Sequence, residues 1–523
     1  MLNLLFHNNP CLNPFIYLYS KFGTLHMGFI QKDALIATVL TYIGISLGYL
    51  NRGVLFLILF TSQQIGLVSL ITTIGLLFAQ LSNLGSIYVT WRFFPFFRNQ
   101  DRKNYGFLLM NCLIILLGII IFTCIYWFFQ EDISKFYSQK SADFLDYYYW
   151  IIPVGIANVY FMIFDFYLRG LHKNIISIFL QEILLRSITL ALLCLFAFEI
   201  ISFHQFLIFN MLGYFFPTTI LLLYLLKIKE FHFSFSSITI PRRFRKILWN
   251  FSLFSYINTL TTLIVISLDT MMIASFIGLT ATGVYTNIIY LTSAIQVPYK
   301  SVLRVSSPLI AKYWKERNLP EMQKLYQKVS SIGMLLGTFS FSIIWINRTE
   351  IFSFLPPEYQ PGIMVFLFLM IGKMVDMVGG LNGTIFSTSR KFKYDLFFSI
   401  FLSFTVFGLN YIWIPIYGIG GAAASTGLAL IVYNLGRIWY VYYAFKIHPF
   451  TKNLFYIFYL FLFLIILNEF ILMKIEWSNI VFSIVAKTGV FMIGFLSPIL
   501  IFKWEPETSS YLQKWKIRLL KKH

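Results

Sequence analysis

Long apolar segments follow one another along nearly the whole chain, and this succession limits the fold more than any other feature. Each segment is about 20 residues long, the length that an α-helix needs to cross a bilayer. The segments lack the short alternating pattern of membrane-barrel strands. Only 12% of the 523 residues are charged, against about a quarter in an average soluble domain, which is too few to coat a water-soluble protein. We therefore predict an all-α, polytopic integral membrane protein.

About fourteen segments qualify as membrane-spanning helices, separated by short turns or basic loops. They cover residues 34–60, 66–90, 107–129, 144–168, 174–198, 204–226, 247–277, 281–303, 329–346, 361–386, 396–414, 419–445, 453–473 and 479–502. Residues 1–33 are predicted to be an N-terminal extension and residues 504–523 a basic cytoplasmic tail. The first 26 residues make a poor signal peptide because they have no basic start and no clear cleavage site, and Met27 is an alternative initiator.

The positions of the basic residues predict the orientation in the membrane. Most of the 41 Lys and Arg lie in alternate loops, whereas the opposite loops hold only Lys135, Lys140, Arg348 and Lys474. Cytoplasmic loops carry such an excess, so both termini are predicted to be cytoplasmic. The net charge of +20 belongs to these loops and does not indicate nucleic acid binding. The four cysteines form no C-x-x-C pair, so no metal site or disulfide framework is predicted.

Two stretches share a pattern that indicates an internal repeat. Ile65-Gly66-Leu67-Val68 and Thr282-Gly283-Val284-Tyr285 each open a span, and a proline in a basic loop follows each of them. We predict two six-helix lobes, residues 34–226 and 247–446, joined by a basic cytoplasmic linker at 227–246. Lobes of the same orientation are related by an axis along the membrane normal. The two spans within residues 447–503 fall outside the repeat. Chance similarity between apolar segments is the alternative explanation.

Several motifs resemble a known family. The stretch from Gly278 contains TGVY at a helix start, then VP, then SPLIAKYW and a charged turn, and residues 414–424 read IPIYGIGGAAA. Together with RFFPFFR upstream, these motifs resemble the bacterial polysaccharide-export flippases (O-antigen or Wzx-like) of the multidrug/oligosaccharidyl-lipid/polysaccharide superfamily. The resemblance implies a fold like that of the multidrug transporters called MATE, and transport instead of catalysis. It also implies a location in the cytoplasmic (inner) membrane of a bacterium. The lipid II flippases are a related branch, described as needing arginines in the first span, where this chain has only Arg52.

Charged side chains inside the spans mark a candidate substrate site. A charge at the bilayer centre costs at least about 2.5–3.5 kcal/mol unless it meets water or a partner. Two of the basic residues have an acid at helical spacing, in Glu182–Arg186 and Lys373–Asp376, and these pairs could simply neutralise each other and hold helices together. The opposing hypothesis is a wet cavity between the lobes whose cations bind a pyrophosphate. The candidate substrate-binding cations are Arg52, Arg186, Lys373 and Arg437.

Acidic residues in or near the spans are candidates for ion coupling or gating. They are Asp165, Glu182, Asp269 and Asp376. Asp165 lies one turn from Arg169 at the cytoplasmic end of span 4, as an interfacial pair or a gate. Asp269 could bind a coupling ion or only bond a neighbouring helix. Na⁺ or H⁺ coupling is compatible with the sequence, and no other cofactor is expected. Lys487, in the last span, could extend outward to the interface.

The resulting hypothesis is a flippase that moves a polyprenyl-pyrophosphate-linked oligosaccharide across the membrane by alternating access, for lipopolysaccharide or other surface polysaccharide export. Its expected partners are this substrate, membrane lipids and, in the same process, a polysaccharide polymerase and glycosyltransferases. A multidrug/cation antiporter of the same superfamily would need acids to dominate the cavity, and a lipid II flippase is a further alternative. A membrane polymerase or ligase would need a large outer loop, which the sequence lacks, and buried charges argue against a receptor or scaffold.

Overall fold

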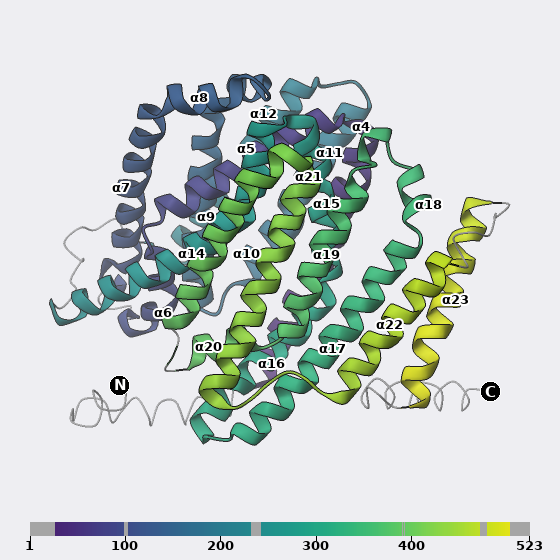
Figure 1. Cartoon of the computed structure of the whole chain (residues 1–523). Helices are drawn as coiled ribbons and strands as arrows, with labels where there is room; N and C mark the ends of the chain where they lie inside the picture. Colours follow the sequence, from purple (N-terminus) through teal and green to yellow (C-terminus); the bar gives the residue numbers. More distant parts are fainter. Residues whose placement is uncertain are drawn as a thin grey trace, which may run out of the picture. The chain divides into compact units, whose positions relative to one another are not determined.

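The fold is helical throughout the part of the chain that the structure, a computed structural model, describes. These residues are 27–98, 103–231, 242–389, 391, 393–470 and 479–502. They contain α-, 3₁₀- and π-helices and no β-strand (Figure 1). The predicted all-α class is therefore confirmed. Residues 1–26, the middle of the predicted linker and the predicted tail lie outside the described residues.

Twelve helical segments of the described residues are long and apolar enough to cross a membrane. The chain is accordingly a multi-pass membrane protein. These segments are Ile36–Leu59, Ser62–Ser82, Asn104–Phe128, Ala142–Gly170, Ile175–Ala197, Phe203–Lys227, Leu248–Phe276, Leu319–Ile346, Pro357–Gly379, Lys393–Phe445, Lys452–Phe470 and Ile480–Ile501.

The predicted number of fourteen spans differs from these twelve at two places. Helix α21 (Lys393–Phe445) is 53 residues long and contains Gly418 at φ 61°, where the chain reverses and its two arms pack against each other. Asp395 of the first arm pairs with Arg437 of the second, so the helix counts as one segment but supplies two antiparallel arms. Helix α15 (Leu279–Ile295), at 17 residues, is shorter than the other segments. The number fourteen therefore stays a prediction.

The described residues fall into two compact units that interleave along the chain. The first unit takes residues up to Leu55, Ser86–Leu116 and Ile156–Leu248, and the second takes Phe56–Gly85, Leu117–Gly155 and the chain from Trp249 onward. The predicted lobes at 34–226 and 247–446 follow the order of the chain instead, and they stay a prediction.

Each unit is built from several helices. The first contains α3 (Met27–Gly48), the π-helix η2 (Tyr49–Leu55), α6 (Ser86–Phe97), η3 (Lys103–Gly106), α10 (Ile175–Phe179), the π-helix η5 (Leu180–Leu184), α11 (Leu185–Ala197), α12 (Phe203–Gly213) and α13 (Phe215–Lys227). The second contains α4 (Phe56–Leu59), α5 (Ser62–Ser82), α8 (Gln130–Ser138), η4 (Ala142–Trp150), α15, α16 (Val297–Glu316), α17 (Leu319–Ile346), α18 (Arg348–Ser353), η7 (Pro357–Tyr359), α19 (Gly362–Gly379), α20 (Asn382–Thr388), α21, α22 (Lys452–Phe470) and α23 (Ile480–Ile501). Helices α7 (Phe107–Phe128), α9 (Ile151–Gly170) and α14 (Arg242–Phe276) contribute residues to both.

The two motifs of the predicted repeat contact each other within the second unit. A Cβ on Gly66 of α5 would lie 1.9 Å from the carbonyl oxygen of Leu279, and a Cβ on Gly283 of α15 would lie 1.9 Å from that of Ser62. Farther along, Thr286 Oγ1 donates to Ser69 Oγ at 3.0 Å. Ser62 and Leu279, Gly66 and Gly283, and Ser69 and Thr286 are thus equivalent positions, each 217 residues apart. Helices α5 and α15 therefore cross with local two-fold symmetry. Glycine at both positions lets the two backbones approach this closely.

A short helix after α17 holds the last two spans. Arg348 of α18 donates to both carboxylate oxygens of Glu469 on α22, at 2.7 and 2.8 Å. Glu350, two residues later, accepts from Ser483 Oγ of α23 at 2.6 Å and from Lys487 Nζ. Helices α17, α22 and α23 consequently lie side by side (Figure 1). Lys487 is buried and paired, so the prediction that it extends outward to the interface is wrong.

Replacing Lys487 by Met should lower the free energy of unfolding by about 3–5 kcal/mol, because Glu350 would remain as a buried charge without its cation. Thermal unfolding of the purified protein, followed by tryptophan fluorescence, measures the change. Lys452→Met is the matched control, since the Lys452 side chain is exposed at the start of α22. Burial alone raises the pKa of Glu350, but hydrogen bonds from Lys487, Ser483 and Thr349 outweigh it and lower the pKa to about 2.

This pKa predicts how the contribution of the pair depends on pH. Because the folded-state pKa lies below the ordinary value of 4.5, the stabilisation is complete above about pH 4.5 and is lost as the pH falls toward 2. The stability difference between the natural protein and Lys487→Met should shrink over the same interval. A difference that stays constant down to pH 2 would contradict the assignment.

Candidate functional site

Two of the four candidate cations lie on π-helical turns or beside them in the first unit. Arg52 is part of η2, and Arg186 follows η5 by two residues. The side chain of Asn51 donates to the carbonyl oxygen of Arg186 at 2.8 Å, so η2 is in contact with α11, the helix that contains Arg186. Single π-helical turns recur at functional sites because they re-aim side chains. The sequence analysis gave no sign of them.

The predicted pair Glu182–Arg186 is formed. Arg186 Nη2 lies 2.7 Å from Glu182 Oε2, and both side chains are half-buried. Helix α3 approaches Glu182 closely because residue 44 is glycine: a Cβ there would lie 2.7 Å from the Glu182 Cβ. Arg186 therefore has a local counter-ion within the helix bundle, as the alternative explanation of this pair expected.

Asp165 ties the end of α9 to α10. Arg169 Nη2 lies 2.7 Å from Asp165 Oδ2, and Ser177 Oγ of α10 donates to Asp165 Oδ1. Asp165 is buried, while the Arg169 side chain is 44% exposed. The predicted pair is present and fixes a turn between two helices. Its role as a gate stays a prediction.

Lys373 and Asp376 of α19, both within the described residues, do not form the ion pair that their spacing allows. Lys373 Nζ donates to Thr292 Oγ1 at 2.7 Å and to Ser293 Oγ at 3.0 Å, both on α15. Asp376 Oδ1 accepts from Asn434 Nδ2 of α21 at 3.1 Å. The explanation of these two residues as a self-compensated pair is therefore wrong, and Lys373 has uncharged hydroxyl partners.

Arg437 pairs with an acid that the sequence analysis missed. Its guanidinium bonds Asp395 of the opposite arm of α21 and lies 4.5 Å from the ring centroid of Tyr433. Asp395 is 42 residues earlier in the chain, so spacing within one helix could not reveal it. The reversal at Gly418 brings the two residues together. Arg437 is 8% exposed.

Asp269 is the centre of a buried polar cluster in the second unit. Its carboxylate accepts from Tyr285 OH of α15 at 2.5 Å, from Asn410 Nδ2 at 2.7 Å and from Thr426 Oγ1 at 2.7 Å, the last two on the two arms of α21. All these partners are uncharged. The side-chain oxygen of Asn410 is buried and accepts no hydrogen bond. A buried carboxylate with amide and hydroxyl oxygens around it can take up a proton or a hard cation, which prefers oxygen ligands.

The chemistry of these oxygens fits Na⁺ better than a transition metal. Within the described ranges, no group of three or more His, Cys, Asp or Glu could hold a metal ion. Asp269 would supply the negative charge and Thr426 a neutral oxygen, and Asn410 would add its side-chain oxygen after a rotation of the amide, because Nδ2 now donates to Asp269. The Asp269 cluster, defined by Asp269, Tyr285, Asn410 and Thr426, was predicted only through its acid.

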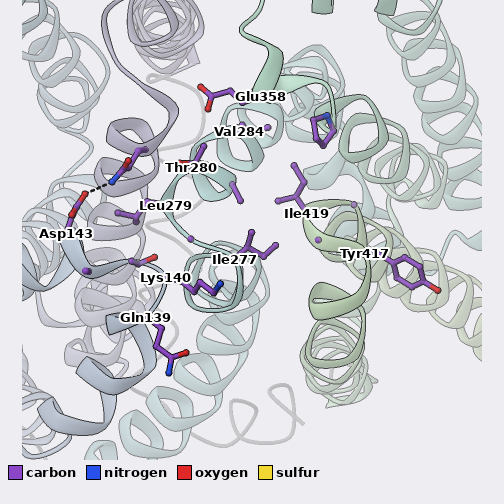
Figure 2. Close-up of a pocket in the computed structure, with 18 of the residues that line it drawn as sticks. Gln139, Lys140, Asp143, Ile277, Leu279, Thr280, Val284, Glu358, Tyr417 and Ile419 are labelled. Carbon is purple, nitrogen blue, oxygen red and sulfur yellow. Dashed lines mark hydrogen bonds between the residues drawn. The ribbon is translucent and has the colours of Figure 1, made fainter.

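A cavity of about 860 Å³ opens at one end of the second unit (Figure 2). Five segments line it, at Gln63, Gln139–Asp143, Ile277–Ala281, Glu358 with Pro361, and Tyr417–Gly420, together with Val284 and Met364. The sequence analysis named none of them as site residues. They lie in turns or in helical residues next to turns, and their common signal in the sequence is a position between predicted spans, or at the end of one, on the side with few basic residues.

Membrane-spanning helices with ion pairs and polar clusters between them define a multi-pass membrane protein. The sequence confirms the family: the chain belongs to the polysaccharide biosynthesis protein family, whose model matches residues 30–314. The capsular polysaccharide biosynthesis protein CapF of Staphylococcus aureus is 23% identical over 151 residues, which cover 29% of this chain and 38% of that relative.

Solved structures share the fold at low sequence identity. The lipid II flippase MurJ, in an inward closed conformation, superposes with a TM-score of 0.70 at 13% identity, covering 90% of this chain and 98% of MurJ. An inward-facing multidrug resistance MATE transporter of the MOP superfamily gives a TM-score of 0.64 at 15% identity, covering 78% of this chain and 98% of the other. The predicted resemblance to these two branches is confirmed at the level of the fold.

Proposed function

We propose that the protein is a flippase that moves a polyprenyl-pyrophosphate-linked oligosaccharide outward across the cytoplasmic membrane, for the export of a surface polysaccharide. Membership of the polysaccharide biosynthesis family and the fold shared with a lipid II flippase support this proposal. The observation that carries it is Lys373. This lysine lies on a membrane-spanning helix and donates to two hydroxyl groups, so its charge is available to an anionic headgroup.

Transport by alternating access needs no covalent step. With a potential that is negative inside, moving one negative charge outward is favourable by about 2.3 kcal/mol per 100 mV. Cations that hold the pyrophosphate also oppose its release, so a second driving ion helps to empty the site. We propose the Asp269 cluster as the binding site of that ion, Na⁺ or H⁺. Arg52, Arg186 and Arg437 remain proposed contacts of the headgroup, in addition to Lys373.

Deletion of the gene should test the proposal directly. We expect loss of the surface polysaccharide and accumulation of the lipid-linked oligosaccharide, both measured by extraction and mass spectrometry. The natural gene and Lys373→Arg should restore export, because both place a cation at this position, whereas Lys373→Met should not. A deletion strain with normal surface polysaccharide and no accumulated intermediate would refute the proposal. Transport of a cationic dye by the purified, reconstituted protein would favour the antiporter.

A further inference from the structure

The cavity at the end of the second unit has an apolar floor and a polar rim. Ile277 and Ile419 come from different turns and lie toward the interior of the cavity (Figure 2). The side chains of Asp143, Glu358 and Thr280 lie around them. A volume of about 860 Å³ is within the range of sites that hold drug-sized ligands, about 300–1,000 Å³. The cavity can therefore hold a small oligosaccharide and contact both its apolar and its hydroxyl-bearing surfaces.

The two carboxylates of the rim are fixed in position by neighbouring side chains. Gln63 Nε2 donates to Asp143 Oδ2 at 2.5 Å, which Figure 2 shows as a dashed line. Ser62 Oγ donates to Glu358 Oε1 at 2.5 Å. Each carboxylate has a second oxygen that can accept a hydrogen bond, and a carboxylate oxygen is a strong acceptor for a hydroxyl donor. Fixed acceptors at a rim discriminate between ligands that carry hydroxyl groups and ligands that do not.

The charge of the lining disfavours an anionic ligand. Its ionisable side chains are the two acids Asp143 and Glu358, one base, Lys140, and the phenol of Tyr417. A pyrophosphate would meet more negative than positive charge here, in contrast to the surroundings of Lys373. The amides of Gln63 and Gln139 and the hydroxyl of Thr280 both donate and accept. This set of groups suits an uncharged polyhydroxyl compound.

The cavity also has a defined place in the transport path. All five connecting segments that line it belong to loops that the distribution of Lys and Arg predicts to be extracytoplasmic. Their meeting at one end of the second unit agrees with that orientation. A ligand in this cavity would be on the side to which the oligosaccharide is delivered.

We propose that this cavity binds uncharged sugar residues of the exported oligosaccharide on the extracytoplasmic side, separately from the pyrophosphate. The inference rests on the proposed function and adds a second, carbohydrate-specific site to it. Sugar bound here retains the chain on the outer side while the headgroup leaves the cations inside the membrane.

A cysteine placed in the cavity tests this inference. Thr280→Cys is made in a chain whose four native cysteines are replaced by alanine and which still restores export in the deletion strain. The probe is the oligosaccharide that mild acid releases from the lipid-linked intermediate of the deletion strain. In protein reconstituted in nanodiscs, a water-soluble maleimide should label Thr280→Cys about tenfold more slowly when the oligosaccharide is present at ten times its Kd, because only the empty cavity reacts.

Controls separate this inference from the proposed function. Gln360→Cys is exposed on a neighbouring segment but does not line the cavity, so its labelling should not change. Inorganic pyrophosphate should not slow the labelling of Thr280→Cys. If the deletion strain accumulates no intermediate, the proposed function fails. If the intermediate accumulates but its oligosaccharide does not protect Thr280→Cys, or if pyrophosphate protects it instead, the carbohydrate site is refuted and the flippase proposal stands.

Discussion

Asp269→Asn should reduce export by about 5- to 150-fold, the range that typical coupling free energies between two ligand sites produce. The variant keeps the size and most of the hydrogen-bonding capacity of the side chain, but it removes the negative charge that a coupling ion needs. The polysaccharide on the surface of the complemented deletion strain measures the effect, at matched amounts of protein in the membrane. Tyr285→Phe is a milder change, since it removes one donor and leaves the carboxylate.

Binding of the ion can be measured without transport. A ligand at 100 times its Kd stabilises the folded state by about 2.7 kcal/mol. If Na⁺ is the ion, NaCl should raise the Tm of the purified protein relative to choline chloride, and Asp269→Asn should abolish the difference. If H⁺ is the ion, the two salts should act alike and export should depend on the proton gradient. Normal export by Asp269→Asn, with unchanged dependence on both ions, would contradict the coupling role.

The sequence predicted the spans well because hydropathy is a local property. Segments such as Phe203–Lys227 and Ile480–Ile501 appear in the structure within a few residues of the predicted bounds. Each of these helices hydrogen-bonds its own backbone N–H and C=O groups, so it needs no partner to cross the membrane. Its length therefore follows from the length of the apolar stretch. The number of spans is harder to predict. Whether α21 counts as one span or two depends on the turn at Gly418, and α15 is shorter than the other spans.

Partners of the buried charges could be predicted only where both members share one helix turn. Glu182–Arg186 was visible at a spacing of four residues. Asp395 is 42 residues from Arg437, and Glu350 is 137 residues from Lys487, so these pairs depend on packing that no local pattern encodes. The Asp269 cluster was predicted through its acid alone, because its donors come from three helical segments.

The cavity at the second unit was not predicted at all, for a related reason. Its lining residues belong to five separate segments. Two of these overlap the family motifs, at Gly278–Ala281 and Tyr417–Gly420, but those motifs describe turns and do not indicate a binding site. What the sequence did show is the repeat motif at Gly66 and Gly283, which the structure places in direct contact. A small residue in a span therefore signalled close packing, but it did not identify the neighbouring helix.

Arg437→Met should lower the free energy of unfolding by up to about 3–5 kcal/mol, since it leaves Asp395, whose side chain is only 15% exposed, without its cation. Methionine retains much of the length of the side chain against Tyr433 and Phe386, which limits the loss of packing. Thermal unfolding of the purified variant measures the change. The double variant Arg437→Met/Asp395→Asn should recover much of the stability, because no unpaired charge remains buried.

The same two variants separate a structural role of Arg437 from a role in substrate binding. If Arg437 only neutralises Asp395, the double variant should regain export together with stability. If its guanidinium also contacts the pyrophosphate, as the sequence predicted, the double variant should be stable and still fail to export. We expect the second result, because a residue that only stabilised α21 could be replaced by an apolar pair, whereas an anionic headgroup inside the membrane still requires a cation. Full export by the double variant would remove Arg437 from the proposed binding site and leave Lys373 as its principal cation in the second unit.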